Sequence, residues 1–111
     1  MLFLRDGRYV TLVAGMLDWT DYLDRMRGTG VLTAADAVSY GFTGPILRST
    51  GHQRDLRKDT PYLAYADLEF EVPVGILGDN YDRYYVRMRE MDESAYMIRQ
   101  LVTMLPDGPI N

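Results

Sequence analysis

The clearest pattern in the chain is a helical one near its C-terminus. Apolar residues there recur at alternating intervals of four and three: Tyr84, Met88, Met91, Ala95, Ile98, Val102 and Leu105. That spacing places them along one stripe of an α-helix, as in a helix bundle. Asp79 or Asn80 is suited to cap this helix, and Pro106 with Gly108 ends it. About 26 residues at 1.5 Å each predict a rod near 40 Å long, and the chain offers no second helix of that length.

Shorter helices are predicted upstream. One covers residues 19–27, begins after the capping residue Asp18 and ends at Gly28. Another covers residues 34–40 and begins at Thr33, which is followed three residues later by an acidic residue, as in a capping box. Both predictions rest on side chains that accept hydrogen bonds from the first free amides of a helix.

The middle of the chain is less regular. Gly44-Pro45 predicts a turn, and residues 46–67 are polar and mixed, which indicates a loop with short helical turns. Residues 68–74 alternate apolar and acidic side chains and end at a proline and a glycine. We expect an edge strand or an extended segment there. Upstream of the helices, residues 1–17 favour a helix over 9–17, with a hairpin as the alternative.

Composition removes several functions. The net charge of −4 argues against a nucleic-acid surface, which normally carries a basic stripe. The chain has no cysteine, so it offers neither a thiol nucleophile nor thiolate ligands for zinc or an iron–sulfur cluster. Its single histidine, His52, cannot form a usual metal site alone, and we interpret it as a surface loop residue. No apolar run approaches the roughly 20 residues that span a bilayer.

Three blocks of sequence carry a resemblance to a known family. They are GTGVLTAADAVSYGFTGPILRSTGHQRDLRK at residues 28–58, FEVPVG at 70–75 and GDNYDRYYVRMREM at 78–91. In this order and spacing they resemble the large quinone-site subunit of respiratory complex I, the 49 kDa subunit, also called iron–sulfur protein two. The resemblance runs from about Tyr22 to Pro109. That subunit is several times longer, so the resemblance implies an internal slice.

The resemblance implies a fold class and a function. We expect a mainly α fold with a minor extended or β element, cut from a helical-bundle large subunit shared with nickel–iron hydrogenases. Residues 1–17 are a divergent N-terminal segment, and residues 18–111 are the matching internal segment. The implied role is a structural piece of a split core subunit of NADH:ubiquinone oxidoreductase, which carries electrons from NADH to ubiquinone and pumps protons.

The same resemblance implies cofactors, partners and location. The assembly uses NADH, FMN, iron–sulfur clusters and ubiquinone, and we expect this chain to bind none of them directly and to carry no catalytic residue. In the family the quinone-binding histidine and tyrosine lie in an N-terminal part absent here. The expected partners are the rest of the 49 kDa subunit and its neighbours in the quinone module. The expected location is the matrix side of the mitochondrial inner membrane, or the cytoplasmic side in a bacterium.

Charged residues in the matched blocks are candidates for structural or interface roles. These candidates are Arg48, Asp55, Arg57, Asp82, Arg83 and Arg87. An arginine and a carboxylate in one loop are suited to a bidentate pair that fixes the loop against a neighbouring subunit. The alternative is a set of solvated surface pairs, with Arg87 pairing to Glu90 and Arg89 to Glu93 one helical turn away.

Three alternatives remain open at this stage. The short length fits either a split gene or a truncated product. A slice of a membrane-bound hydrogenase large subunit is a second possibility within the same superfamily. A free-standing helical interaction module without redox function is a third, from another class of protein.

Overall fold

The computed structural model describes residues 19–106 and 108, and within them it is helical with no strand. The elements are α2 (Trp19–Met26), α3 (Ala34–Ser39), α4 (Gly44–Ser49), α5 (Leu56–Asp59), the 3₁₀ helix η1 (Leu63–Asp67) and α6 (Asn80–Met104). The predicted mainly helical fold with one long C-terminal helix is therefore confirmed. The predictions for residues 1–17 and the cap at Asp18 lie outside the described residues.

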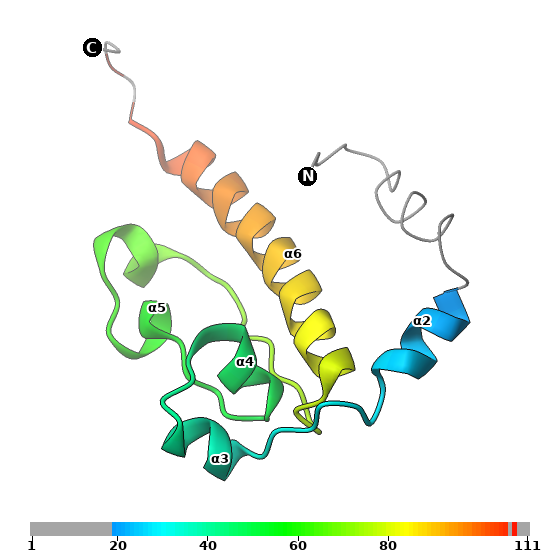
Figure 1. Ribbon diagram of the computed structural model, residues 1–111. Helices are drawn as coiled ribbons and strands as arrows, with labels where there is room; N and C mark the ends of the chain where they lie inside the picture. Colours follow the sequence, from blue (N-terminus) through cyan, green and yellow to red (C-terminus); the bar gives the residue numbers. More distant parts are fainter. Residues whose placement is uncertain (1–18, 107, 109–111) are drawn as a thin grey trace.

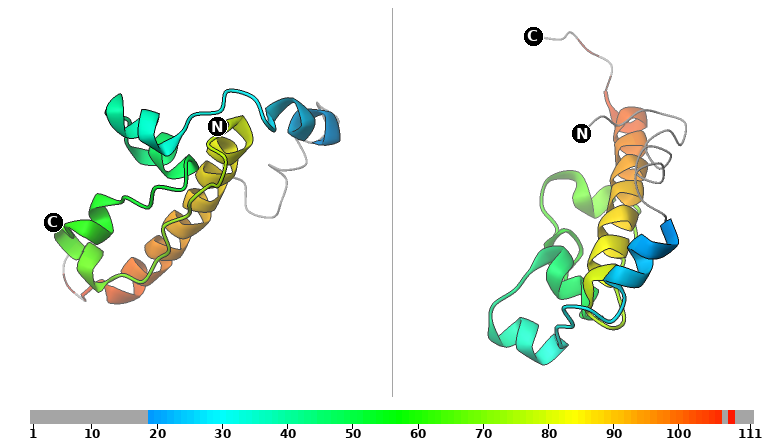
Figure 2. Two further views of the ribbon diagram at one scale, coloured as in Figure 1. Left: turned by 90° about the horizontal axis from the view of Figure 1, so that it is seen from below. Right: turned by 45° about the vertical axis from the view of Figure 1, so that its right-hand side comes forward.

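Helix α6 is the spine of the molecule. Figure 1 shows it as a long diagonal rod, with α2 on one side of its N-terminal end and α3, α4 and α5 on the other. Figure 2 shows the same separation from two further directions. The radius of gyration is 17.0 Å, whereas a compact domain of 100 residues has about 13 Å. The helices therefore form an open arrangement around one end of α6.

Capping residues explain where two of the helices begin. The Thr33 hydroxyl accepts the Asp36 amide at 3.1 Å, as the capping-box pattern predicts, and it also donates to the Asp36 carboxylate at 2.7 Å. At α6, Asp79 is the N-cap and accepts the amide of Asp82 at 2.8 Å. The turn predicted at Gly44-Pro45 is wrong, because these residues begin α4. Proline is well suited there, since its φ angle is helical and its missing N–H needs no partner.

Residues 68–74 are extended and lie beside α6, but they pair with no strand among the described residues. Side chains of α6 bind their backbone instead. Glu69 donates its amide to Gln100 Oε1 at 2.9 Å, and Gln100 Nε2 donates to the Glu69 carbonyl at 2.6 Å. Glu71 donates its amide to Glu93 Oε2 at 3.0 Å. Of the two interpretations of the alternating pattern, the extended segment is right and the edge strand is wrong.

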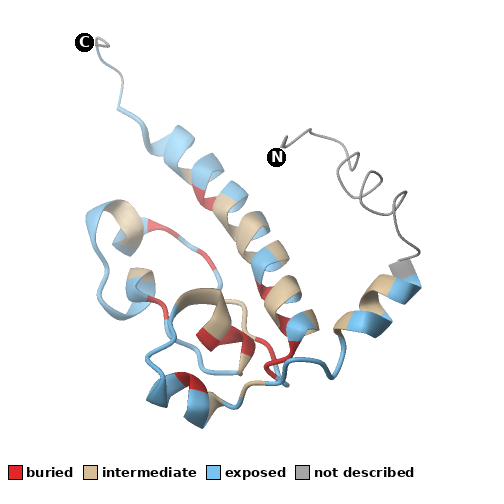
Figure 3. Cartoon of the chain, viewed as in Figure 1, coloured by how far each residue is buried: buried red, intermediate tan, exposed pale blue. Residues whose placement is uncertain are grey.

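The hydrophobic core is small. The buried hydrophobic residues are Ala37, Leu47, Leu68, Phe70, Val86 and Met97. Leu68, Phe70 and Met97 form one cluster where the extended segment meets α6, with Tyr65 and Val72 packed against it. Figure 3 shows buried residues gathered near the N-terminal half of α6, whereas the C-terminal end of that helix is exposed.

The stripe predicted on α6 is not the face that this chain buries. The chain covers Asp82, Val86 and Met97. The second half of the predicted stripe stays open: Ile98, Val102 and Leu105 are 60%, 62% and 70% exposed. We call Ile98, Leu101, Val102 and Leu105 the apolar stripe of α6. The described residues therefore leave this face uncovered near the C-terminal end of the helix, although Met97 on another face is buried against the extended segment.

Candidate functional site

The N-terminal end of α6 is bound into the fold by the carboxylate of Asp82. One oxygen of this buried side chain accepts three consecutive backbone amides, from Ile76 at 3.0 Å, Leu77 at 2.5 Å and Gly78 at 3.1 Å. Hydrogen bonds to an ionised acceptor are stronger than neutral ones. The carboxylate therefore fixes the turn before α6. The interpretation of Asp82 as part of a solvated charged face is wrong, because the preceding turn folds back over it.

Asp79 links the same turn to a distant part of the chain. Its side chain is 1% exposed and accepts the Asp82 amide through Oδ1 and the Gly28 amide through Oδ2, each at 2.8 Å. Burial by itself raises the pKa of this carboxyl, but the amide donors outweigh burial and hold the pKa below its usual value. Asp79 is thus charged and anchors the residues that follow α2.

Arg83 strengthens this link. Its Nη1 donates to the Gly78 carbonyl at 2.7 Å, and its Nη2 donates to the Gly30 carbonyl at 2.7 Å and to Asn80 Oδ1 at 2.6 Å. The guanidinium therefore joins residues 53 positions apart. Arg87, one turn further along, is exposed and donates through Nη1 to the Arg83 carbonyl at 2.9 Å.

Arg48 joins α4 to the middle of α6. It is 8% exposed, and its Nε and Nη2 contact Glu90 Oε1 at 2.7 and 2.6 Å. Its Nη1 donates to the Arg54 carbonyl at 2.9 Å and lies 4.0 Å from Asp55 Oδ2. We call Arg48, Asp79, Asp82, Arg83 and Glu90 the basal network, because they connect the loops and short helices to the first half of α6.

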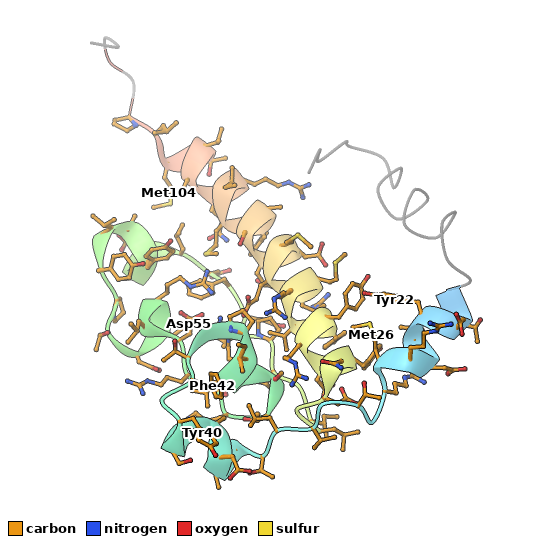
Figure 4. The ribbon with its side chains drawn as sticks, in the orientation of Figure 1. Tyr22, Met26, Tyr40, Phe42, Asp55 and Met104 are labelled. Carbon is orange, nitrogen blue, oxygen red and sulfur yellow. The ribbon has the colours of Figure 1, made fainter. Side chains whose placement is uncertain are left out.

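Asp55 and Arg57 form a bidentate pair beside Arg48. Arg57 Nε lies 2.9 and 3.1 Å from the two Asp55 carboxylate oxygens, and its Nη2 lies 2.5 Å from Oδ2. Burial raises the pKa of Asp55, but the bonds from Arg57 and the charge of Arg48 outweigh it and lower that pKa. The bond to Asp55 raises the pKa of Arg57. Figure 4 marks Asp55 where the loop before α5 comes close to α4.

Two ion pairs predicted on α6 do not form among the described residues. Glu90 binds Arg48 rather than Arg87, and Glu93 accepts the Glu71 amide rather than binding Arg89. Sequence reasoning missed Glu90 and Asp79 as links between distant segments. Helical spacing reveals only neighbours on the same helix, and Arg48 is 42 residues from Glu90. No local signal identifies that partner.

The polar side chains described above bind one another and the backbone of the same chain. Each buried side-chain nitrogen or oxygen in the described part of the chain has a hydrogen-bond partner. Within the same part, no group of three or more histidine, aspartate or glutamate side chains is arranged to hold a metal ion. The whole sequence lacks cysteine, so it does not fit an iron–sulfur cluster held by thiolates. His52 lies exposed in a loop. No helix described here is both long and apolar enough to cross a bilayer.

A family model described as "Respiratory-chain NADH dehydrogenase, 49 Kd subunit" matches residues 15–111. The chain belongs to this family. It is 60% identical over 105 residues to the corresponding NADH-quinone oxidoreductase subunit of Pelobacter propionicus, covering 94% of this chain and 26% of that protein. It is 51% identical over 89 residues to the mitochondrial NADH-ubiquinone oxidoreductase 49 kDa subunit of Neurospora crassa, covering 80% and 19%.

A solved structure shares the fold of this 49 kDa family member. It belongs to the membrane-bound sulfane sulfur reductase, an archaeal respiratory membrane complex, and matches with a TM-score of 0.77 at 39% identity. The match covers 93% of this chain and 28% of that chain. The chain therefore spans between about a fifth and just over a quarter of the length of these three proteins.

Proposed function

We propose that this chain is a scaffold segment of the large subunit in the quinone module of NADH-quinone oxidoreductase. In this role α6 completes a helical bundle, and the rest of that subunit with its neighbours covers the apolar stripe. The complex as a whole transfers electrons from NADH to a quinone at a respiratory membrane. FMN, iron–sulfur clusters and the quinone belong to the assembly, and this chain supplies no catalytic residue.

The distribution of hydrophobic side chains supports this role most directly. Exposed large hydrophobic residues outnumber the buried ones in the described chain, and several of them follow one another along α6. Monomeric soluble proteins rarely expose a continuous apolar patch unless it is an interaction site. At about 25 cal/mol per Å² of apolar surface, covering this stripe is a substantial driving force for association.

The charged candidates divide by their geometry. Arg48, Asp55 and Asp82 are buried and bonded within the chain, which favours an internal structural role. Arg87 is exposed and its contact is local, so it is the candidate best placed to meet a neighbouring subunit. The interface role predicted for the whole set of Arg48, Asp55, Arg57, Asp82, Arg83 and Arg87 stays a prediction.

The quinone-reducing version of the family is favoured over the sulfur-reducing one. Identity is 60% to the Pelobacter propionicus protein and 51% to the Neurospora crassa protein, against 39% to the sulfane sulfur reductase. For the hydrogenase alternative, the chain offers no separate supporting observation. Nickel in the purified assembly would favour that alternative.

Affinity purification of the tagged chain from native membranes, followed by mass spectrometry, tests the proposal. Other components of NADH-quinone oxidoreductase should be recovered with it. Recovery of the chain as a free monomer contradicts the proposal. The intact mass of the tagged polypeptide separately tests whether the 49 kDa subunit is split, which also stays a prediction.

A further inference from the structure

One edge of the extended segment is paired and the other is open. The amides of Glu69 and Glu71 face α6 and are bound by Gln100 and Glu93. In an extended chain the N–H and C=O groups of successive residues point to opposite edges. Those of Phe70 and Val72 therefore point away from α6. Neither residue donates or accepts a backbone hydrogen bond in the described part of the chain.

The open edge borders a hollow of about 600 Å³. One wall is the segment itself, through Phe70, Glu71 and Val72, and the other is formed by Gln53, Lys58 and Asp59 at α5. Phe70 is 5% exposed as a whole residue, and its backbone N–H and C=O have no hydrogen-bond partner in the described chain. Unpaired backbone groups in such positions are rare in proteins, because leaving them without partners is costly.

The geometry points to a specific occupant. We propose that the open edge at residues 70–72 receives an extended segment of another polypeptide as an added β-strand; the edge closes at Leu68, whose amide donates to the Tyr65 carbonyl at 3.4 Å. Exposed strand edges bind peptides in this way through main-chain hydrogen bonds, and the side chains nearby set the specificity.

The charges around the edge decide the chemistry of that strand. Glu69, Glu71 and Asp59 are exposed acids on or beside the segment. Two cations lie over the Phe70 ring: the Lys58 amine at 4.6 Å from its centre and the Arg57 guanidinium at 5.1 Å, of which Arg57 is already paired with Asp55. The rim is therefore acidic, and the added strand carries lysine or arginine at alternate positions. This inference goes beyond the scaffold role and does not depend on it.

A titration of the isotope-labelled full chain with a blocked hexapeptide of alternating valine and lysine tests the proposal by nuclear magnetic resonance. Binding should shift the amide signals of Phe70 and Val72 and slow their hydrogen exchange at least about tenfold, while Glu69 and Glu71 change less. The double variant Glu69→Gln/Glu71→Gln should bind about two to five times more weakly.

Two control peptides test the main-chain hydrogen bonds without any change to the protein. One peptide is N-methylated at its valines and the other at its lysines, so that each lacks the donors of one edge. One of the two should bind at least about tenfold more weakly, which corresponds to about 1.4 kcal/mol. Equal binding by both, or unchanged signals for Phe70 and Val72, overturns the added strand. Equal binding of a valine–glutamate peptide overturns the basic character of its side chains.

Discussion

The two halves of α6 meet different surroundings. In the first half, Asp82 binds three backbone amides, Asp79 binds the residues after α2, and Glu90 binds Arg48 of α4. In the second half, Glu93 and Gln100 bind the extended segment on one face, whereas the apolar stripe lies open on another. The buried side-chain nitrogens and oxygens of the described chain all have hydrogen-bond partners, whereas much apolar surface is not covered. The chain therefore fixes the geometry around the start of α6 with its own polar contacts but leaves a large apolar surface uncovered, which the scaffold proposal assigns to other subunits.

The largest expected effect comes from breaking the buried ion pair of the first half. Arg48→Met leaves the Glu90 carboxylate and the Arg54 carbonyl without their donor, and we expect a loss of about 3–5 kcal/mol in the free energy of unfolding. Urea titration followed by circular dichroism measures it. Arg48→Met/Glu90→Leu is the matched control and should recover much of the loss. Salt bridges exposed to solvent contribute less than about 1 kcal/mol, so a cost in that range for the single variant would contradict a buried ion pair between Arg48 and Glu90.

Two glycines allow the effect of close packing at the turn before α6 to be separated from that of backbone strain. Gly78 and Gly41 both have positive φ, +69° and +72°, so alanine is strained at either position. A Cβ at Gly78 would lie 2.1 Å from the Leu32 carbonyl oxygen, whereas a Cβ at Gly41 meets nothing within 4 Å. We expect Gly78→Ala to cost about 2–5 kcal/mol and Gly41→Ala about 1–2, measured by the same urea titration. Equal losses of stability for the two variants would show that the turn before α6 shifts to accommodate the added methyl group.

The same substitution, valine to alanine, can be made in each half of α6. Val86 is fully buried and Val102 is 62% exposed. Val86→Ala should destabilise the isolated chain by about 2 kcal/mol through the cavity it leaves. Val102→Ala should change stability by less than about 0.5 kcal/mol. Thermal unfolding of each variant beside the parent chain measures the two changes in stability. A large cost at Val102 in the isolated chain would mean that the stripe is covered by the same polypeptide.

Acid should weaken the turn at Asp79. Its folded-state pKa lies below the ordinary 3.8, so its stabilising contribution is complete above that pH and is lost as the pH falls through the folded value. Asp79→Asn should cost about 1 kcal/mol at pH 7, and the difference from the parent chain should shrink below pH 3.8. Urea titrations at several pH values measure it. Asp92→Asn controls for the change in net charge, and a difference that persists in acid would assign the effect to packing.

The sequence predicts local features of this fold and misses distant ones. Caps at Thr33 and Asp79 are readable because the cap and its amide are three residues apart. The alternation over residues 68–74 reveals an extended backbone but not its partner, since Gln100 lies 31 residues away on a helix. Helical periodicity finds the apolar stripe on α6. It does not find the face that holds Asp82 and Glu90, because those side chains are polar and are buried only through partners elsewhere in the chain.

The cysteine-free sequence permits a direct measurement of whether other subunits cover the apolar stripe. Val102→Cys places a single thiol on the stripe, and Asp92→Cys places one at a side chain that is 74% exposed. Both thiols should react with maleimide at similar rates in the free chain. In the assembly purified from membranes, the thiol at position 102 should react at least about tenfold more slowly while the control at position 92 stays reactive. Equal reactivity at position 102 in the free chain and the assembly would contradict the scaffold account.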